Sequence, residues 1–348
     1  MNHRKSTWAA LGLALAVVCT PSHAIFTNGG FEAGNTTGWT TQFYTTGPLT
    51  GAPPFTGANT QLNPVDPASL AYYNNQLDPN WVYVSRGYTW MAYQQFLDEV
   101  WNGPQNLKGQ MEAKHPSRVK VVGAGFTDPQ GAPLVLPRSG SNTLMLNNSS
   151  YTYSYDSGGG VMVTDTYAAA SSKANTIVQS DTVTAADRDP ADGKLHVRFS
   201  YAAVLDDAGH APQDQPYFYL RVRNTTKNTV LFEDFAFASA SNPDFHPIPA
   251  PTSPFSNFLY KDWTDMDIVV PDADLGDTIE VYLLAADCSQ GGHSGYAYLD
   301  GFGSRRLPPP GTPDTVAPVP TVGEFGLMGL AMGLGLLGVG RLRAARRR

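Results

Sequence analysis

Two imidazoles and two carboxylates in the second half of the chain are the side chains best suited to bind a metal ion. Asp207 and His210 directly follow one segment of alternating hydrophobic and polar residues, and Asp287 and His293 follow another. If the two loops converge at one end of a β-fold, the four side chains could bind a divalent metal. Alternatively, each histidine donates a hydrogen bond to a backbone carbonyl and fixes its own loop, and the sequence favours this second interpretation.

No catalytic centre stands out among the other polar residues. The stretch from Gly292 to Gly295 contains a serine, but Tyr296 stands where a Gly-x-Ser-x-Gly nucleophile motif needs its last glycine. Carboxylates are numerous, yet no pair is set apart as the acid and base of a glycosidase. We therefore predict that the protein is not an enzyme, with a secreted polysaccharide hydrolase as an alternative.

Aromatic residues gather between residues 81 and 101. Trp81, Tyr83, Trp90 and Trp101 lie in this range, and apolar residues from Trp90 to Trp101 could line one face of a helix. The rings could form a small separate core, or they could form a platform on which sugar rings stack. Both interpretations stay open, so these four residues are candidates for ligand binding.

The elements that must position these residues are β-strands. In KLHVRFSY, residues 194–201, Leu195, Val197 and Phe199 face one way, with His196 and Arg198 on the other side. Similar alternation elsewhere predicts an all-β, jelly-roll-like antiparallel β-sandwich. Residues 40–115 interrupt this rhythm and are expected to form an irregular, partly helical insertion. The acidic stretches 262–267 and 272–277 are expected to be solvated loops.

Charge and cysteine content exclude several classes of protein. The chain has 23 Lys and Arg against 30 Asp and Glu, a net charge of −7, and its last residues are rich in arginine, so the body is more acidic still. Phosphate backbones would be repelled, which excludes nucleic acid as a partner. Only Cys288 lies beyond the first 24 residues, so neither an internal disulfide nor a four-thiolate zinc site can form in the body.

The first 24 residues have the features of a secretory signal peptide. Arg4 and Lys5 precede an apolar run, and the small residues Ser22 and Ala24 suit signal peptidase. We expect cleavage before Ile25 and export of the body, residues 25–306.

The C-terminal end has the features of a second targeting segment. A Pro-rich linker, residues 307–318, leads to the apolar residues 325–340 and then to an arginine cluster. The apolar run spans about 24 Å as a helix, somewhat less than the ~30 Å hydrocarbon core of a bilayer. The arginines favour the cytoplasmic side, which leaves the body outside that membrane.

The segment VPTVGEF before this run resembles the signature of IPTL-CTERM sorting signals, relatives of the PEP-CTERM class of Gram-negative bacteria. Pro320, Thr321 and Glu324 match the signature, and Val319 and Phe325 are conservative departures. By this resemblance, a membrane sorting protease would cut near this motif and release the body to the cell surface. Otherwise residues 325–340 would remain as a transmembrane helix that anchors the protein.

The start of the body, FTNGGFEAGNTTGW, resembles the first strand of carbohydrate-binding modules and related galactose-binding-like jelly rolls, and AYLDGF resembles their last strand. In these relatives the two strands lie side by side and hold a structural calcium ion. The resemblance implies Glu32 and Asp300 as side-chain ligands of Ca²⁺, which prefers oxygen ligands. Without calcium, Glu32 would cap a turn and Asp300 would end a strand.

Residues 201–222 and 287–303 also resemble two segments that recur together in large secreted bacterial surface proteins, for which the resemblance implies a sandwich domain and no reaction. The sequence thus predicts an exported cell-surface or extracellular-matrix protein that binds extracellular polysaccharide. The alternative is a structural surface protein that binds another protein.

Overall fold

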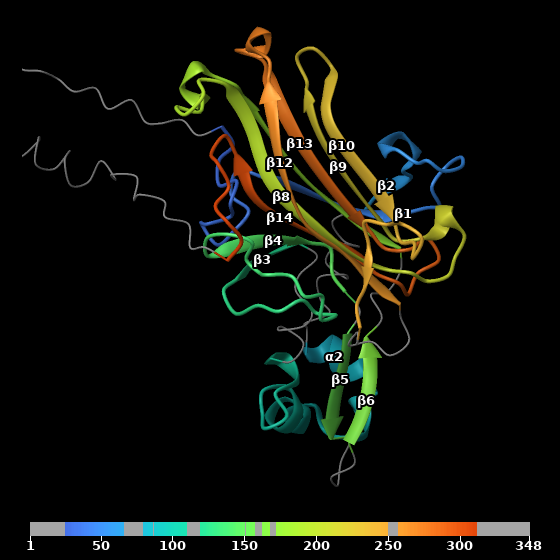
Figure 1. Cartoon of the computed structure of the whole chain (residues 1–348). Coiled ribbons are helices and arrows are strands. Elements are labelled where there is room, and N and C mark those ends of the chain that lie inside the picture. Colours follow the sequence, from blue (N-terminus) through green and yellow to red (C-terminus); the bar gives the residue numbers. More distant parts are fainter. Residues whose placement is uncertain are drawn as a thin grey trace, which may run out of the picture.

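Two six-stranded antiparallel sheets packed face to face form the body of the protein (Figure 1). A computed structural model describes residues 25–65, 79–85, 87–109, 119–149, 151–156, 162–167, 172–249 and 257–311. The predicted all-β, jelly-roll-like antiparallel sandwich is therefore confirmed.

The first sheet, sheet A, has the strand order β10-β9-β13-β7-β1-β2. Its strands are β1 (Thr40–Thr46), β2 (Leu62–Pro64), β7 (Lys173–Thr182), β9 (Tyr217–Asn224), β10 (Thr229–Phe237) and β13 (Thr278–Ala286). The second sheet, sheet B, has the order β11-β12-β8-β14-β4-β3. Its strands are β3 (Val119–Gly123), β4 (Asn142–Leu146), β8 (Leu195–Asp206), β11 (His246–Pro247), β12 (Phe258–Val270) and β14 (Gly295–Gly303). Because neighbouring strands come from distant parts of the chain, loops far apart in sequence meet at the ends of the sandwich.

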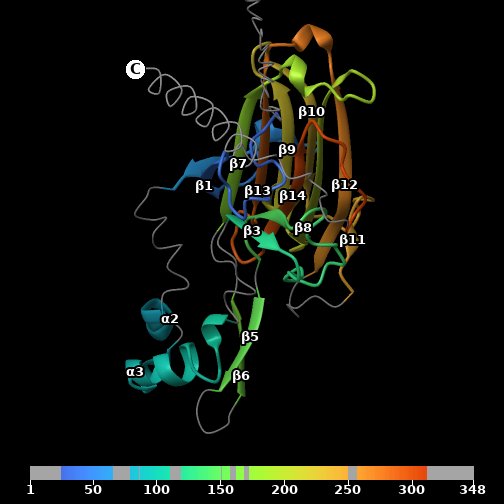
Figure 2. The ribbon, with the colours of Figure 1, turned by 90° about the vertical axis from the view of Figure 1, so that its left-hand side faces the viewer.

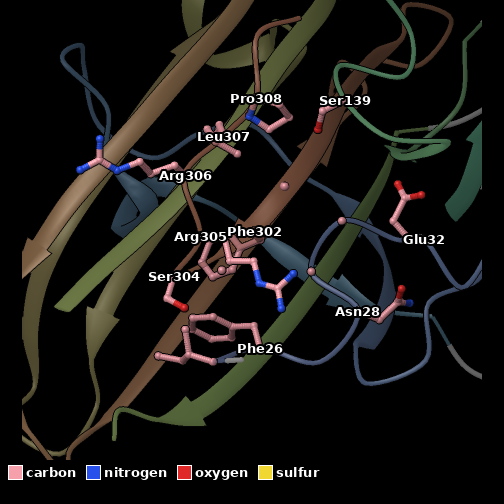
Figure 3. Close-up of a pocket in the computed structure, with 15 residues that line it drawn as sticks. Phe26, Asn28, Glu32, Ser139, Phe302, Ser304, Arg305, Arg306, Leu307 and Pro308 are labelled. Atoms are coloured by element: carbon pink, nitrogen blue, oxygen red, sulfur yellow. The ribbon is translucent and has the colours of Figure 1, made fainter. Parts of the chain in front are cut away.

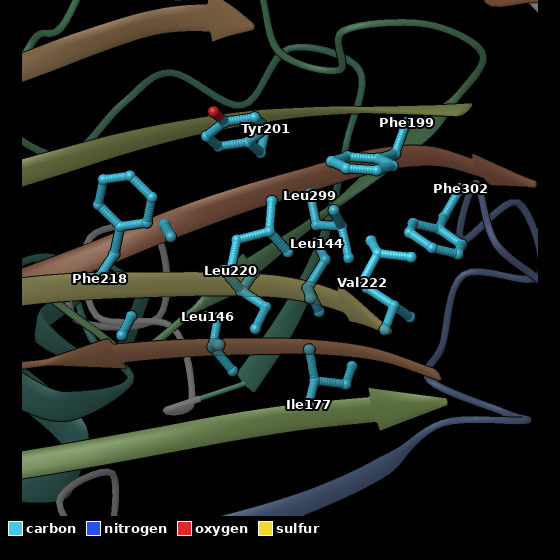
Figure 4. Packing of buried hydrophobic residues seen from close by; sticks show 14 of the residues in the cluster. Leu144, Leu146, Ile177, Phe199, Tyr201, Phe218, Leu220, Val222, Leu299 and Phe302 are labelled. Atoms are coloured by element: carbon cyan, nitrogen blue, oxygen red, sulfur yellow. The ribbon is translucent and has the colours of Figure 1, made fainter. Parts of the chain in front are cut away.

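The alternation of the strands builds the core between the sheets (Figure 4). Phe199 of β8 and Leu220 of β9 are fully buried in it, and Leu144 and Leu299 join them from sheet B. Side chains alternate across a strand, so every second residue of each central strand contributes to this core and its neighbours form the outer faces of the sandwich.

The outer faces are partly covered by loops. Residues 47–61 fold over one end of sheet A, where Leu49 and Phe55 pack on its tyrosines and phenylalanines. On sheet B, Asp128 lies in the segment between β3 and β4, and its carboxylate accepts hydrogen bonds from the hydroxyls of Tyr296 (3.0 Å) and Tyr298 (2.8 Å). These two tyrosines of the GYAYLD stretch therefore attach the covering loop to the sheet.

The prediction of an irregular insertion at residues 40–115 is wrong for its first residues, because β1 and β2 are strands of sheet A. The helical part comprises α2 (Pro79–Ser85), α3 (Tyr93–Gln95) and a π-helical turn, Phe96–Trp101. With the ribbon of β5 (Tyr151–Asp156) and β6 (Met162–Tyr167), it extends from one end of the sandwich (Figure 2). The helical part has its own hydrophobic core, centred on Phe96 and Trp101.

The structure corrects one expectation about charged residues. Residues 262–267 are not a loop but part of β12. Their Asp265 binds Arg138 in a bidentate pair (2.6 and 3.1 Å), and Asp267 binds Arg198 at 2.9 Å. His196 and Arg198, on the outer side of β8, are themselves buried, because these ion pairs and the segment after β14 cover them.

The C-terminal strand leads into residues that lie on the body. Arg138 donates a hydrogen bond to the carbonyl of Pro308 (2.7 Å), and Gly311 donates one to the carbonyl of Arg138 (2.9 Å). The first residues of the predicted linker 307–318 are therefore packed against sheet B. The predicted signal peptide and the predicted sorting segment 319–348 lie outside the described residues, and no helix within the described ranges is long and apolar enough to cross a membrane.

Candidate functional site

The residues predicted to hold calcium bind the same loop, residues 138–142. Glu32 accepts hydrogen bonds from the backbone amides of Ser141 (3.0 and 3.1 Å) and Asn142 (3.2 Å). Asp300, in β14, accepts one from the amide of Ser139 at 3.0 Å. The segment that contains Glu32 forms turns rather than the expected strand, but it lies beside the last strand, where the amide of Phe302 donates to the carbonyl of Gly29.

Asp300 is 1% exposed, and its Oδ1 is buried without a hydrogen-bond partner among the described residues. Burial raises the pKa of Asp300 to about 8; the charge of Glu32 adds to this rise, and the amides of Ser139 and Gly301 oppose it. A carboxylate in this position would be stabilised by a cation with oxygen ligands, so Asp300 fits the expected Ca²⁺. Glu32 is exposed and already binds two amides, so backbone carbonyls or water would have to supply the other ligands.

A pocket of about 430 Å³ lies beside this pair, between the start of the body and the residues that follow β14 (Figure 3). Its apolar part includes Phe26 and Phe302, whose ring centroids are 4.5 Å apart. Asn28, Glu32 and Arg305 add polar groups to the lining. The pocket is large enough for a small ligand, but both of its phenylalanine rings are buried in the core.

The loops after β8 and β13 meet at one end of the sandwich and bring the two predicted histidines together. The rings of His210 and His293 lie 5.0 Å apart between centroids. A residue that the sequence did not single out as a ligand, Cys288, joins them, with its Sγ 3.7 Å from His293 Nδ1. Burial raises the pKa of the Cys288 thiol and lowers that of His293, and the charge of His210 lowers the latter further.

The two predicted carboxylates of this cluster have other partners. Asp207 accepts hydrogen bonds from Gln215 Nε2 (2.8 Å) and from the amide of Ala240 (3.1 Å). Asp287 is buried and accepts a hydrogen bond from Asn147 Nδ2 at 2.8 Å. The structure thus brings together His210 and His293 but not the carboxylates, and the spacing Cys-x₄-His was the signal that could have pointed to Cys288.

A charged cluster occupies the outer face of sheet B. His196 contacts Asp192 through Nε2 (3.1 Å) and Asp267 through Nδ1, and Asp189 lies close to Asp192 and His196. Asp189 is bound by Arg198 (2.9 Å) and Arg306 (3.0 Å). A backbone hydrogen bond from Ala191, followed by that of Arg306, lowers the pKa of Asp189 to about 2. Because arginines already neutralise Asp189, we interpret this charged cluster as a network of ion pairs rather than as a cation site.

Of the four aromatic candidates for ligand binding, the structure leaves one clearly accessible. Trp90 is 55% exposed, whereas Trp101 is 3% exposed and packs in the small helical core, so it has no surface for a ligand. Tyr83 packs against that core, and its hydroxyl donates to the carbonyl of Met91 at 2.6 Å. The side chain of Trp81 lies outside the described residues.

A second aromatic surface, which the sequence did not reveal, lies on the outer face of sheet A, next to the cluster that Leu49 and Phe55 cover. Here the register places Tyr282 of β13 beside Arg221 of β9, and Arg221 beside Glu233 of β10. The Arg221 guanidinium lies 5.4 Å from the centroid of the half-buried Tyr282 ring. Glu280 binds both Arg221 (3.1 Å) and Arg223 (2.8 Å). We call these five residues the Tyr282 face.

No protein-family model matches the chain, and no curated protein matches it either. The chain is similar to the solved structure of TmCBM61 in complex with β-1,4-galactotriose, with 9% identity, 81% of this chain and 97% of that chain covered, and a TM-score of 0.31. It is also similar to Caldicellulosiruptor saccharolyticus CBM27-1 in complex with mannohexaose, with 11% identity, coverage of 55% and 84%, and a TM-score of 0.27. A third similar structure is CBM28, a non-crystalline cellulose specific carbohydrate-binding module, with 10% identity, coverage of 55% and 82%, and a TM-score of 0.24. Because these TM-scores are low, the similarities carry no argument about this chain, and its fold is assigned from its own two sheets.

Proposed function

We propose that the protein is a non-catalytic, polysaccharide-binding β-sandwich of the cell surface or extracellular matrix. The observation that carries this proposal is the Tyr282 face, which combines a half-buried aromatic ring with guanidinium and carboxylate groups on neighbouring strands. A sugar ring has an apolar face that packs on an aromatic ring, and its hydroxyls both donate and accept hydrogen bonds. Tyr282 would supply the aromatic contact, and Arg223 and Glu233 would supply donors and acceptors at its edges.

Among the described residues, the positions of the carboxyl groups of raised pKa support a binding role over hydrolysis. Glycoside hydrolysis needs a carboxylic acid of raised pKa that reaches the substrate. Burial raises the pKa of both Asp128 and Asp300. Asp128 is enclosed by two tyrosine hydroxyls, and Asp300 is 1% exposed, so neither reaches a ligand on the surface.

A structural Ca²⁺ bound by Asp300 and Glu32 would stabilise this sandwich. The proposal is supported by the buried, unpartnered Oδ1 of Asp300 and by the approach of Glu32 to the same loop. The ion would neutralise Asp300 and join the start of the body to its last strand; it would take no part in ligand chemistry.

Export through the signal peptide and sorting through residues 319–348 complete the proposal. Cleavage before Ile25 is supported by the setting of that residue, which is 1% exposed and whose backbone nitrogen donates to Asp187 Oδ1 at 2.9 Å. Cleavage would turn this nitrogen into an ammonium group that a buried carboxylate can neutralise. Sequencing the N-terminus of the exported protein would test this step, and any first residue other than Ile25 would contradict it.

Affinity electrophoresis of the purified full-length protein through a panel of neutral and acidic polysaccharides tests the binding function. We expect retardation by at least one polysaccharide, and about a tenfold loss of affinity in Tyr282→Ala, because one aromatic contact contributes roughly 1.4 kcal/mol. Tyr260→Ala, which removes a half-buried tyrosine on sheet B, is the matched control and should bind like the wild type. If no polysaccharide retards the protein, the carbohydrate proposal fails, and a protein partner becomes the better account.

A further inference from the structure

The loop that carries Cys288 is a tight turn that returns the chain to His293. The Cys288 amide donates to the carbonyl of His293 (3.0 Å), and the Gly291 amide donates to the carbonyl of Cys288 (3.2 Å). Gly291 and Gly292 have φ angles of 81° and 94°, a region that glycine adopts without steric cost. The backbone therefore holds the thiol and the imidazole side by side.

The loop that carries His210 is fixed independently. Gln215, 5% exposed, donates from Nε2 to the His210 carbonyl (3.2 Å) and to Asp207 Oδ1 (2.8 Å). His210 Nε2 is buried and has no hydrogen-bond partner among the described residues. A buried polar atom without a partner costs free energy, which a metal ion bound at this nitrogen would recover.

The distances suit a small ion with thiolate and imidazole ligands. The ligand atoms of His210, Cys288 and His293 all lie within 4.8 Å of one another, and Cys288 Sγ is 3.7 Å from His293 Nδ1. A tetrahedral zinc ion with Zn–S near 2.3 Å and Zn–N near 2.1 Å would separate a sulfur and a nitrogen ligand by about 3.6 Å. We propose that His210, Cys288 and His293 bind one Zn²⁺ ion, with the fourth position left to water or to an external ligand.

The ligand types argue for zinc rather than for a hard cation. Thiolate and imidazole favour borderline-soft transition metals, whereas Ca²⁺ prefers oxygen ligands such as those at Asp300. The ion would also join the loop after β8 to the loop after β13, and so connect sheet B to sheet A at this end of the sandwich. A structural role of this kind is independent of polysaccharide binding.

Titration of reduced, chelator-stripped full-length protein tests the proposal. With a chromophoric chelator as competitor, we expect one Zn²⁺ per chain. Co²⁺ in the same site should give the intense visible bands of a tetrahedral complex and a sulfur-to-cobalt charge-transfer band. Absence of that charge-transfer band from the wild-type Co²⁺ complex would overturn the proposal, because it would show that Cys288 is not a ligand.

Variants assign the ligands. Cys288→Ser should remove the charge-transfer band, and both Cys288→Ser and His210→Ala should weaken zinc binding at least about 100-fold, since loss of an outer partner alone costs about 10- to 100-fold. His246→Ala is the matched control, because His246 lies on β11 with a side chain 53% exposed. Equal zinc affinity in Cys288→Ser and the wild type would refute the site. If a variant fails to fold, the wild-type Co²⁺ spectrum and the zinc stoichiometry still decide whether the protein has this zinc site.

Discussion

The clearest energetic consequence of the structure concerns the buried carboxyl group of Asp300. Its pKa is about 8 in the folded protein, against 3.8 for an ordinary aspartate. At a pH below both pKa values, the carboxyl group is neutral in the folded and in the unfolded protein, so its burial adds no ionisation penalty to folding. Between them the unfolded chain releases the proton while the folded protein keeps it, so stability falls as pH rises, by up to about 1.4 kcal/mol per pH unit. Above pH 8 the loss levels off, at roughly 6 kcal/mol in total.

Asp300→Asn removes the titrating group and keeps the size of the side chain. Without calcium, we expect the variant to gain stability relative to the wild type as pH rises from 4 to 8, by up to roughly 6 kcal/mol. The side-chain oxygen of the asparagine can still accept the hydrogen bond from the backbone amide of Ser139, which spans 3.0 Å in the wild type. The effect should be small at pH 4, where the carboxyl group has only begun to lose its proton in the unfolded chain and is still neutral in the folded protein.

Urea unfolding at several pH values in the presence of EDTA, followed by tryptophan fluorescence, measures this difference. Asp262→Asn is the control, because the side chain of Asp262 is 65% exposed, and its curve should run parallel to that of the wild type. If the wild-type and Asp300→Asn stabilities ran parallel from pH 4 to 8, Asp300 would not carry a raised pKa and the reasoning would be refuted.

Three further predictions concern the cation, the charged face of sheet B and the processed N-terminus. At pH 8, Ca²⁺ at 100 times its dissociation constant should stabilise the wild type by about 2.7 kcal/mol, and Glu32→Gln should shift this response to higher Ca²⁺ in thermal melts; an unchanged dependence would remove Glu32 as a ligand. Arg198→Ala should lower the free energy of unfolding by about 1.5–3 kcal/mol, because it removes the charge-assisted contacts that this 3% exposed guanidinium makes with Asp189 and Asp267; a loss below about 1 kcal/mol in urea would show that the network is dispensable. Asp187→Asn should destabilise the exported protein more than the uncleaved chain, because only the former has an ammonium group at Ile25; equal shifts in melting temperature would contradict this pairing.

The sandwich could be predicted from the sequence because its central strands alternate cleanly. Leu195, Val197 and Phe199 all enter the core between the sheets, as their spacing indicates. Local sequence was misleading for residues 262–267, where three acidic side chains suggested a loop. They lie in a strand because Arg138, more than 120 positions away in the chain, satisfies Asp265 from the covering segment. A partner so distant in sequence cannot be inferred from local pattern.

The candidate sites could be predicted only in part, because local sequence shows where loops begin but not which distant residues contact them. The positions of His210 and His293 just after strands suggested that their loops meet, and they do. The sequence could not show that Asn147 of the loop after β4 takes Asp287 away from them, nor that a turn brings Cys288 beside His293. The Tyr282 face depends on the register of three strands, which no single segment of the sequence specifies.

The most direct test of the proposed function is the affinity of the full-length protein for polysaccharide, compared between Tyr282→Ala and Trp90→Ala. Trp90 is 55% exposed on the helical part, away from the Tyr282 face, so the two variants separate the two aromatic surfaces. We predict that Tyr282→Ala loses about tenfold in affinity while Trp90→Ala binds like the wild type. Undiminished binding by Tyr282→Ala would contradict the assignment of the Tyr282 face as the polysaccharide-binding surface.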